Sequence, residues 1–189
     1  MKILVIAPHL DDECWSAALL VRHLYMADTV SILSLSHAGY RHVSNDAIMS
    51  EHNASVDILR EHGKVKQITV CLEPYTMSDN STELRQAIWN VIHDEKPDLV
   101  LVPAMYDCHP DHQAARTAGI AVAWKTEANI FGYLVPGNST RQVQTQRAIV
   151  THADMQVKQA MIDCYKSQRF RGQHEAGTEE RFEIVRMGI

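Results

Sequence analysis

Short hydrophobic runs alternate with amphipathic segments along most of the chain. Runs typical of buried strands lie at Lys2–Ala7, Val30–Leu35, Lys66–Cys71, Leu99–Val102, Asn129–Tyr133 and Arg147–Thr151. Segments with helical periodicity lie between them, at Asp12–Met26, Asp46–His62, Ser81–Glu95, Asp111–Lys125 and Asp154–Ser167. Because alternating strands and helices form right-handed crossovers, the pattern predicts a single α/β domain over residues 1–189. Its sheet is expected to be doubly wound (Rossmann-like) and mostly parallel, with helices on both faces.

Residues that commonly end or begin helices stand at the expected boundaries. Gly63 follows the second helical segment and Pro97 the third. Asp154 is expected to cap the last helix. The loop 135–145 and the tail after Phe170 show neither the strand-like nor the helical pattern, so we expect irregular structure there.

Composition and charge narrow the class of protein. A hydrophobic fraction of 46% and a charged fraction of 22% are typical of an ordinary globular domain. The net charge of -5 argues against nucleic acid or an anionic membrane as a partner. The N-terminal run is too short for a signal peptide, and no stretch approaches the ~20 apolar residues of a membrane helix. Four widely spaced cysteines argue against a disulfide framework. We therefore expect a cytoplasmic protein.

Two polar clusters follow predicted strands at the edge where open parallel sheets bind ligands. The first is Ala7-Pro8-His9-Leu10-Asp11-Asp12-Glu13, and the second, after the fourth strand, is Asp107-Cys108-His109-Pro110-Asp111-His112. In the usual doubly wound order these two strands are neighbours, so we expect the clusters to meet.

Together the clusters supply ligands for a metal ion: the imidazoles of His9 and His112 and carboxylates at Asp11, Asp12, Asp107 and Asp111. Two imidazoles and one carboxylate form a typical catalytic zinc shell with the fourth position left for water. Bound zinc lowers the pKa of that water to ~7, and spare acidic and histidine groups supply a base and an acid. An aspartate that opens a helix is more often only an N-cap, as Asp12 or Asp111 alone would be. Two such clusters on equivalent loops favour the metal site.

These motifs resemble those of the LmbE-like (PIG-L) de-N-acetylase family, which are zinc-dependent N-acetylglucosaminyl deacetylases. Pro8 to Glu13 is similar to the family's P-H-P-D-D-E, and His109 to His112 matches its H-P-D-H. Weaker similarities are Glu51, Leu59 and Gly63 in the second helical segment, and the stretch from Lys158 to Ser167-Gln168, which resembles K-x-x-A-x-x-x-Y/H-x-S-Q.

The resemblance implies a role for each motif residue. His9, Asp12 and His112 would bind the metal, usually Zn2+, with another divalent metal left open. Asp11 would be the general base that deprotonates the metal-bound water. His109 would protonate the departing amine or stabilise the oxyanion, and Asp111 would orient His109.

The resemblance also implies the class of reaction, removal of an N-acetyl group from an amino-sugar-type substrate such as a small sugar or a glycoconjugate. Family members are often homo-oligomers, which leaves self-association open. Two positions depart from the family pattern: Leu10 replaces a proline, and Ile48 stands where an arginine often helps to hold substrate. Arg41 is a candidate substitute, and His37 and Tyr106 are further candidates for substrate contacts.

Two other functions stay open at this point. A metal-dependent phosphoesterase would suit the aspartates and histidines, although two-metal phosphatases need more bridging carboxylates. A non-catalytic nucleotide-binding α/β module would suit the fold, but no G-x-G-x-x-G follows the first strand and the acidic first motif would repel a pyrophosphate.

Overall fold

A mostly parallel sheet forms the centre of the computed structural model, which describes residues 1–26, 28–37, 43–135, 138, 146–167 and 180–187. The described part contains a seven-stranded sheet with the order β3-β2-β1-β4-β5-β7-β6. The strands are β1 (Lys2–Ala7), β2 (Thr29–Ser34), β3 (Lys64–Thr69), β4 (Leu99–Pro103), β5 (Asn129–Tyr133), β6 (Gln146–Arg147) and β7 (Arg181–Arg186). Strands β1 to β5 pair in parallel, whereas β7 is antiparallel to both β5 and β6. The predicted fold class is confirmed.

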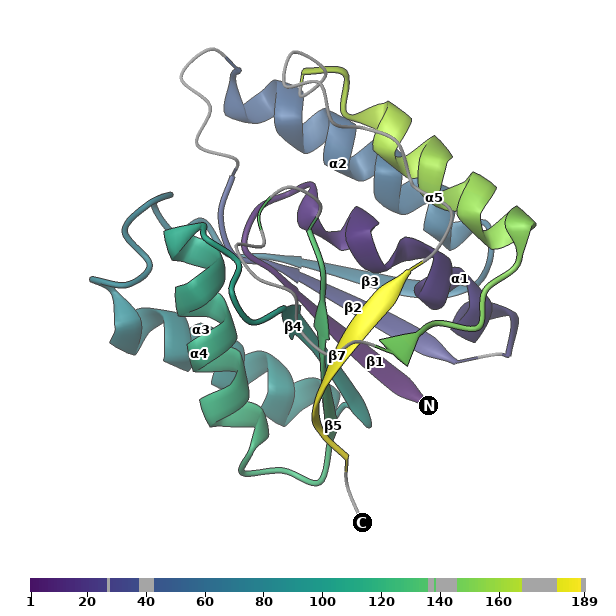
Figure 1. Ribbon diagram of the computed structural model, residues 1–189. Coiled ribbons are helices and arrows are strands. Elements are labelled where there is room, and N and C mark those ends of the chain that lie inside the picture. Colours follow the sequence, from purple (N-terminus) through teal and green to yellow (C-terminus); the bar gives the residue numbers. More distant parts are fainter. Residues whose placement is uncertain (27, 38–42, 136–137, 139–145, 168–179, 188–189) are drawn as a thin grey trace.

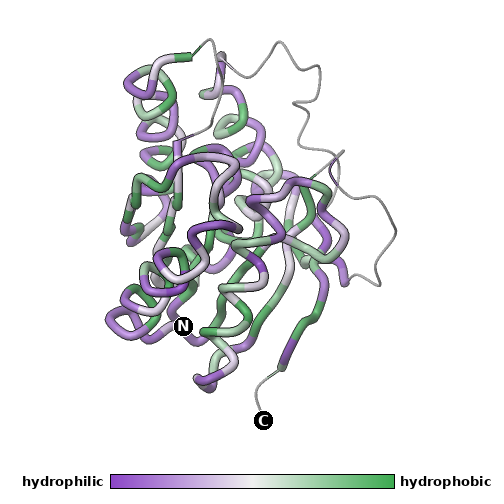
Figure 2. The backbone as a smooth tube through the Cα atoms, turned by 90° about the vertical axis from the view of Figure 1, so that its left-hand side faces the viewer, coloured by the Kyte–Doolittle hydropathy of each residue, from purple (hydrophilic) through white to green (hydrophobic). Residues whose placement is uncertain are grey.

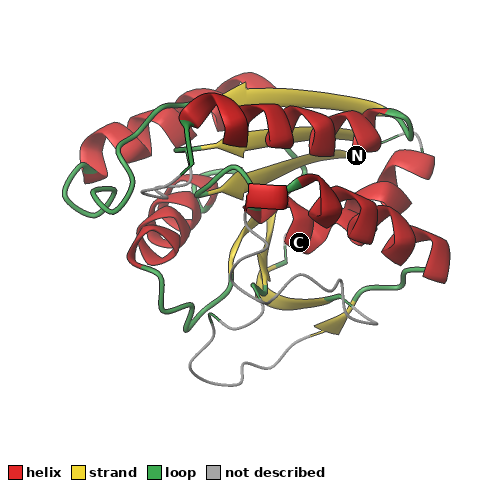
Figure 3. Ribbon diagram, turned by 90° about the horizontal axis from the view of Figure 1, so that it is seen from above, coloured by secondary structure: helices red, strands yellow, loops and turns green. Residues whose placement is uncertain are grey.

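Helices cover both faces of the sheet, as Figures 1 and 3 show. They are α1 (Ala17–Tyr25), α2 (Asn45–Arg60), α3 (Ser81–Glu95), α4 (Pro110–Ala123) and α5 (His152–Cys164), and a short 3-10 helix, η1 (Asp12–Ser16), precedes α1. Helices α1, α2 and α5 pack on one face, and α3 and α4 pack on the other. Among the described residues, no helix is both long and apolar enough to cross a membrane.

Alternate residues of the central strand divide the core into two halves. Ile3 and Val5 of β1 belong to the cluster under α1, α2 and α5, whereas Leu4 and Ile6 belong to the cluster under α3 and α4. This division follows from the strand geometry, in which successive side chains point to opposite faces. Figure 2 shows the corresponding pattern, with hydrophobic stretches in the strands and mixed character along the outer helices.

Helix α4 approaches the sheet closely through a glycine. A Cβ atom at Gly119 would lie only 2.9 Å from Val102 Cγ1 and 3.0 Å from Ile6 Cδ1. A larger residue would therefore push α4 away from β4 and β1. Because α4 begins within the second motif, this contact also sets the position of that motif relative to the end of β1.

Four details differ from the sequence-based expectations. The first helical segment is divided into η1 and α1. The last helix is capped by Thr151, with Asp154 at the third helical position in a capping box. The tail after Phe170, expected to be irregular, contains β7, which pairs with β5. The predicted strand Arg147–Thr151 overlaps the observed β6 (Gln146–Arg147) only at Arg147.

Candidate metal centre and active site

The two motif loops lie side by side at one edge of the sheet. Strands β1 and β4 pair in parallel from Ile3–Leu99 to Val5–Leu101, so the loops that follow them leave the same edge. The strand order also reverses here, since β2 and β3 extend the sheet on one side of β1 and β5 extends it beyond β4. Ligands of open α/β sheets bind at such a reversal. The expected meeting of the two clusters is confirmed.

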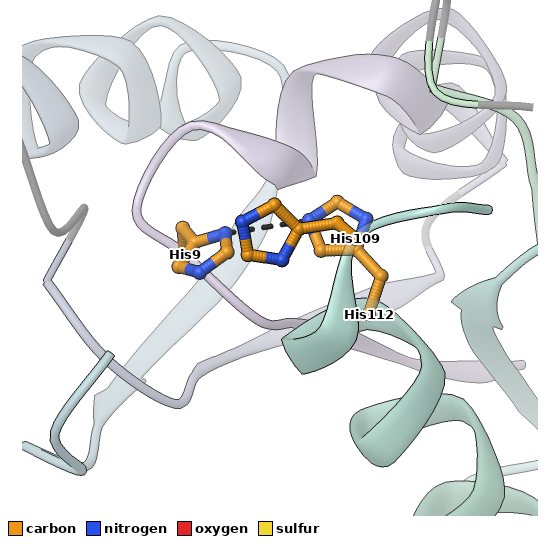
Figure 4. Close-up of side chains that lie close together, drawn as sticks. All are labelled: His9, His109 and His112. Atoms are coloured by element: carbon orange, nitrogen blue, oxygen red, sulfur yellow. Dashed lines mark hydrogen bonds between the residues drawn. The ribbon is translucent and has the colours of Figure 1, made fainter. Parts of the chain in front are cut away.

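Three side-chain atoms of these loops form a nearly equilateral triangle. His9 Nδ1 lies 3.4 Å from Asp12 Oδ2 and 3.3 Å from His112 Nε2. Asp12 Oδ2 lies 3.2 Å from His112 Nε2. All three residues are buried. Figure 4 shows the imidazole of His9 facing those of His109 and His112, which come from the start of α4.

The triangle has the dimensions of one face of a zinc coordination sphere. A tetrahedral zinc ion with bonds of about 2.0–2.1 Å holds neighbouring ligand atoms about 3.3–3.4 Å apart, and two imidazoles with one carboxylate are a donor set that zinc accepts. His109 offers a further donor, because ligand atoms of His9, His109 and His112 all lie within 4.8 Å of one another. The residues present therefore fit a zinc ion.

Each histidine of the triangle also contacts a carboxylate through its other ring nitrogen. His112 Nδ1 lies 2.8 Å from Asp107 Oδ2, and His9 Nε2 lies 3.1 Å from Asp111 Oδ2. Metal-binding histidines usually donate their second N–H to such a partner, which fixes the tautomer and the ring orientation. Sequence reasoning assigned no specific role to Asp107, whose only signal was an acidic residue next to the second motif.

Asp111 lies in the cluster, but its carboxylate has other partners than expected. The sequence placed it in support of His109, whereas its Oδ2 contacts His9 Nε2 and accepts a 2.7 Å hydrogen bond from the backbone N–H of Tyr75. The other oxygen, Oδ1, is buried and finds no hydrogen-bond partner among the residues that the structure describes. Asp111 and His109 are joined through the backbone instead, because the N–H of Asp111 donates to His109 Nδ1 at 3.2 Å.

His109 is the N-cap residue of α4, a position usually taken by Ser, Thr, Asp or Asn. Because its Nδ1 accepts the backbone N–H of Asp111, the neutral ring carries its proton on Nε2. Burial and the neighbouring His9 and His112 lower the pKa of His109 to about 4. The ring is therefore neutral near pH 7 and has one N–H to donate.

Asp11 is partly buried beside the cluster. It stands at the N-cap position of η1, yet its side chain makes no capping hydrogen bond. Burial and the adjacent charge of Asp12 raise the pKa of Asp11 to about 7. A carboxyl group with such a pKa exchanges a proton readily at neutral pH.

Neighbouring carboxylates raise the pKa values of the two histidines of the triangle. Burial lowers the pKa of each histidine, but contacts with Asp111 and Asp12 outweigh this at His9 and raise its pKa to about 9. Contacts with Asp12 and Asp107 raise the pKa of His112 to about 10 in the same way. Burial raises the pKa of Asp12, but the two histidines outweigh it and hold this pKa well below its usual range.

A fully buried polar cluster lies behind the first motif. The Tyr165 hydroxyl donates to the carbonyl of Leu10 and lies 2.5 Å from Glu13 Oε1. The same hydroxyl lies 2.9 Å from His52 Nδ1, and Ser55 Oγ donates to Glu13 Oε1 at 3.0 Å. These contacts connect the turn that carries His9 and Asp12 to α2 and α5. Tyr165 belongs to the stretch at the end of α5 that resembles the family motif, so these contacts give that stretch a structural role.

The other residues considered for substrate contacts are placed as follows. Ile48 is buried in the core under α1, α2 and α5. His37 is partly buried at the end of the segment after β2. Tyr106 is exposed in the loop after β4. Arg41 lies outside the described residues.

Comparison with known proteins identifies one family. The family model described as PIG-L, GlcNAc-PI de-N-acetylase, matches residues 4–123, which include both motifs. No curated protein matches the sequence.

Solved structures with the same fold share little sequence with this chain. The A40926 pseudoaglycone deacetylase Dbv21 is 19% identical, with a TM-score of 0.78 over 99% of this chain and 98% of that chain. N,N'-diacetylchitobiose deacetylase from Pyrococcus horikoshii is 16% identical, with a TM-score of 0.67 over 97% and 83%. GalB, the 4-carboxy-2-hydroxymuconate hydratase from Pseudomonas putida KT2440, is 15% identical, with a TM-score of 0.75 over 100% and 97%. At these identities the similarity establishes the fold alone.

Proposed function

The chain belongs to the GlcNAc-PI de-N-acetylase (PIG-L) family, and from this premise we propose that it is a zinc-dependent hydrolase that removes the N-acetyl group of an amino sugar. The observation that carries the proposal is the spacing of His9 Nδ1, Asp12 Oδ2 and His112 Nε2, which lie 3.2–3.4 Å apart. This triangle lies where the strand order reverses, at the usual ligand position of the fold.

His9, Asp12 and His112 would hold the zinc ion, which supplies an activated water and a Lewis acid for the amide carbonyl. Asp107 and Asp111 would keep the two imidazoles in the ligating tautomer, since each contacts the ring nitrogen that faces away from the triangle. This leaves Asp11 and His109 for the chemistry of the substrate.

Asp11 takes the proton of the attacking water in this proposal and returns it to the amine nitrogen as the C–N bond breaks. Asp11 adjoins the proposed ligand Asp12 and its side chain makes no capping hydrogen bond at η1, so the carboxylate is placed to exchange a proton beside the triangle.

Of the two roles considered for His109, stabilisation of the oxyanion has the better support. With Nδ1 occupied by the N–H of Asp111, the neutral ring can donate its Nε2–H to the carbonyl oxygen as negative charge develops there. Acting as an acid would require a second proton on Nδ1, which the backbone N–H of Asp111 opposes because it already occupies that nitrogen.

The test combines turnover with metal analysis. Protein loaded with Zn2+, and in parallel with Co2+, Mn2+ or Ni2+, is assayed for amine release from N-acetylated mono- and disaccharides, with a phosphate monoester as the competing substrate class. Asp11→Asn should lower kcat by about 10²–10⁴-fold, as expected for loss of general acid–base catalysis, and keep one metal ion per chain.

Two further variants separate the possible ligand sets. Asp12→Ala should lose the metal, whereas His109→Ala should retain it and lose turnover. Phosphate release without amine release would overturn the proposed reaction. If Asp12→Ala keeps the metal and His109→Ala loses it, the third ligand is His109 and not Asp12.

A further inference from the structure

The loop after β3 places an aromatic side chain at the edge of the metal-ligand cluster. The backbone N–H of Tyr75 donates to Asp111 Oδ2 at 2.7 Å. The centroid of its ring lies 5.1 Å from that of His109, with 34° between the ring planes. Tyr75 is far along the chain from both motifs, yet its backbone and its ring are each held against a motif residue.

Tyr75 occupies a turn position that usually takes glycine. In Glu73-Pro74-Tyr75-Thr76, the N–H of Thr76 donates to the carbonyl of Glu73, and φ of Tyr75 is 64°. Proline at the second position and a positive φ at the third are typical of a type II turn, in which glycine is preferred at the third position. A side chain makes this conformation less favourable, so the turn itself does not account for the tyrosine.

Packing in the core does not account for it either, since 55% of Tyr75 is exposed. Tyr106, in the loop after β4, is also exposed and also has a positive φ, 66°. Lys96, which shares a positive φ with them, ends α3, where a left-handed residue is usual. Strained backbone positions concentrate at functional sites, and these two tyrosines lie on loops that border the same cluster.

Three loops that the structure describes around the cluster bear on the charge of the ligand that such a ring could meet; Arg41, in the loop after β2, lies outside the described residues. Residues 7–16, 71–80 and 104–113 contain no lysine or arginine, and each of these segments contains acidic residues. A phosphate or carboxylate group of a ligand would find no cationic partner in them. An uncharged ligand with an apolar face would instead match an exposed aromatic ring.

We propose that the ring of Tyr75 is a substrate subsite that stacks on the apolar face of an uncharged N-acetylated sugar and holds its amide group against the His9–Asp12–His112 triangle. This inference rests on the proposed function and adds the residue and the charge class of the substrate. The ring suits this role, because the backbone that carries it is held by the N–H bond to Asp111 and the ring itself lies against His109, so it loses little freedom on binding.

Tyr75→Gly tests the subsite without endangering the fold. Glycine favours the positive φ of this position and keeps the N–H that binds Asp111, so the melting temperature should not fall. The variant should raise KM for an uncharged N-acetylated sugar about tenfold with a much smaller change in kcat, and Tyr75→Phe, which keeps the ring, should reverse most of this rise. Tyr25→Ala is the matched control, because Tyr25 is also 55% exposed beside a histidine ring, that of His62, but at the other end of α1.

Binding to zinc-loaded Asp11→Asn, measured by calorimetry, gives a readout that does not require turnover. Adding Tyr75→Gly to this variant should weaken binding of N-acetylglucosamine about tenfold, and the 6-phosphate of the same sugar should bind less tightly than the sugar itself. If no sugar is turned over but this difference is seen, the proposed reaction fails and the subsite stands. Turnover or binding that is insensitive to Tyr75→Gly, the absence of any sugar binding, or a preference for the phosphorylated sugar would overturn the subsite.

Discussion

Replacing Asp107 by asparagine isolates the contribution of one outer carboxylate to metal binding. Asp107 is buried and contacts two donors, His112 Nδ1 at 2.8 Å through Oδ2 and the backbone N–H of His109 at 2.9 Å through Oδ1. Asparagine has the same shape but only one acceptor oxygen. Whichever way the amide is turned, its NH2 group faces one of these two donors and leaves it without a partner.

The expected loss follows from this count of acceptors. A buried donor left unsatisfied costs about 1–3 kcal/mol. Loss of a carboxylate partner from a metal-binding histidine typically lowers metal affinity 10–100-fold, or about 1.4–2.7 kcal/mol. The two ranges agree, so we expect Asp107→Asn to lower zinc affinity by one to two orders of magnitude, roughly.

The loss should depend on pH in a direction set by His112. Without metal, the pKa of His112 is raised to about 10, so zinc must displace a proton from it at neutral pH. Asp107 is one of the groups that favour this proton. Removing its charge lowers the pKa of His112, makes the displacement easier and offsets part of the loss at neutral pH. The difference between variant and wild type should therefore grow as the pH rises toward about 10.

Chelator-competition titrations at several pH values measure this directly. Asp94→Asn is the matched control, because Asp94 also lies beside a histidine nitrogen, His93 Nδ1 at 3.3 Å, but both residues are exposed. It should leave zinc affinity unchanged. An affinity of Asp107→Asn equal to that of the wild type, or a difference that shrinks with rising pH, would refute the assignment of Asp107 to the histidine ligand.

Two further predictions concern stability. The pKa values of His9 and His112 are raised from 6.5 to about 9 and about 10, so their contribution to the stability of metal-free protein is present below pH 6.5 and lost as the pH rises through these values. The melting temperature of chelator-treated protein should fall over this interval, and zinc-loaded protein should not show the fall; identical profiles would contradict the ligand assignment. Tyr165→Phe removes the hydroxyl that binds the Leu10 carbonyl, and should lower the free energy of unfolding by about 1–3 kcal/mol in urea titrations. Tyr25→Phe, at an exposed site, should have no effect, and an equal loss in both variants would argue against the buried cluster.

The sequence predicted the elements whose signals are local. The bounds of β1, α3 and β5 agree with the structure at both ends, because hydrophobic runs and flanking residues such as Pro97 define them. The neighbouring position of the two motifs followed from the doubly wound order, which requires only the alternation of strands and helices. These features do not depend on contacts between distant residues.

Strand β7 depended on such contacts and was missed. Its sequence, Arg181-Phe182-Glu183-Ile184-Val185-Arg186, carries charges at both ends and in the middle, and only Phe182 of the six is buried. It is held by antiparallel pairing with β5, some fifty residues earlier in the chain. Glu180, immediately before it, accepts the N–H groups of Ala18 and Leu19 and pairs with Lys158. Nothing in the local pattern indicates these partners.

The same limit applies within the site. Sequence reasoning located the loops that approach each other, but not which nitrogen of each imidazole faces which carboxylate. The assignment of Asp111 to His109 came from spacing along one loop, whereas the structure pairs its carboxylate with His9 from the other. Tyr75 reaches the cluster from a third loop that contains no metal-ligand motif. Such cross-loop contacts depend on the folded positions of three strands.

At the two motifs, aspartates near a helix start have partners other than the helix end. Asp11 stands at the N-cap of η1 without capping it, although an aspartate there normally would. Helix α4 is capped by His109, which leaves the carboxylate of Asp111 directed to His9. At Thr151, where no chemistry is implied, a complete capping box is present. Around the His9–Asp12–His112 triangle, carboxylates that could stabilise a helix end are thus directed to other partners. A protein that needed these residues for folding alone would gain stability by using them as caps, so their present positions favour a role in binding and chemistry.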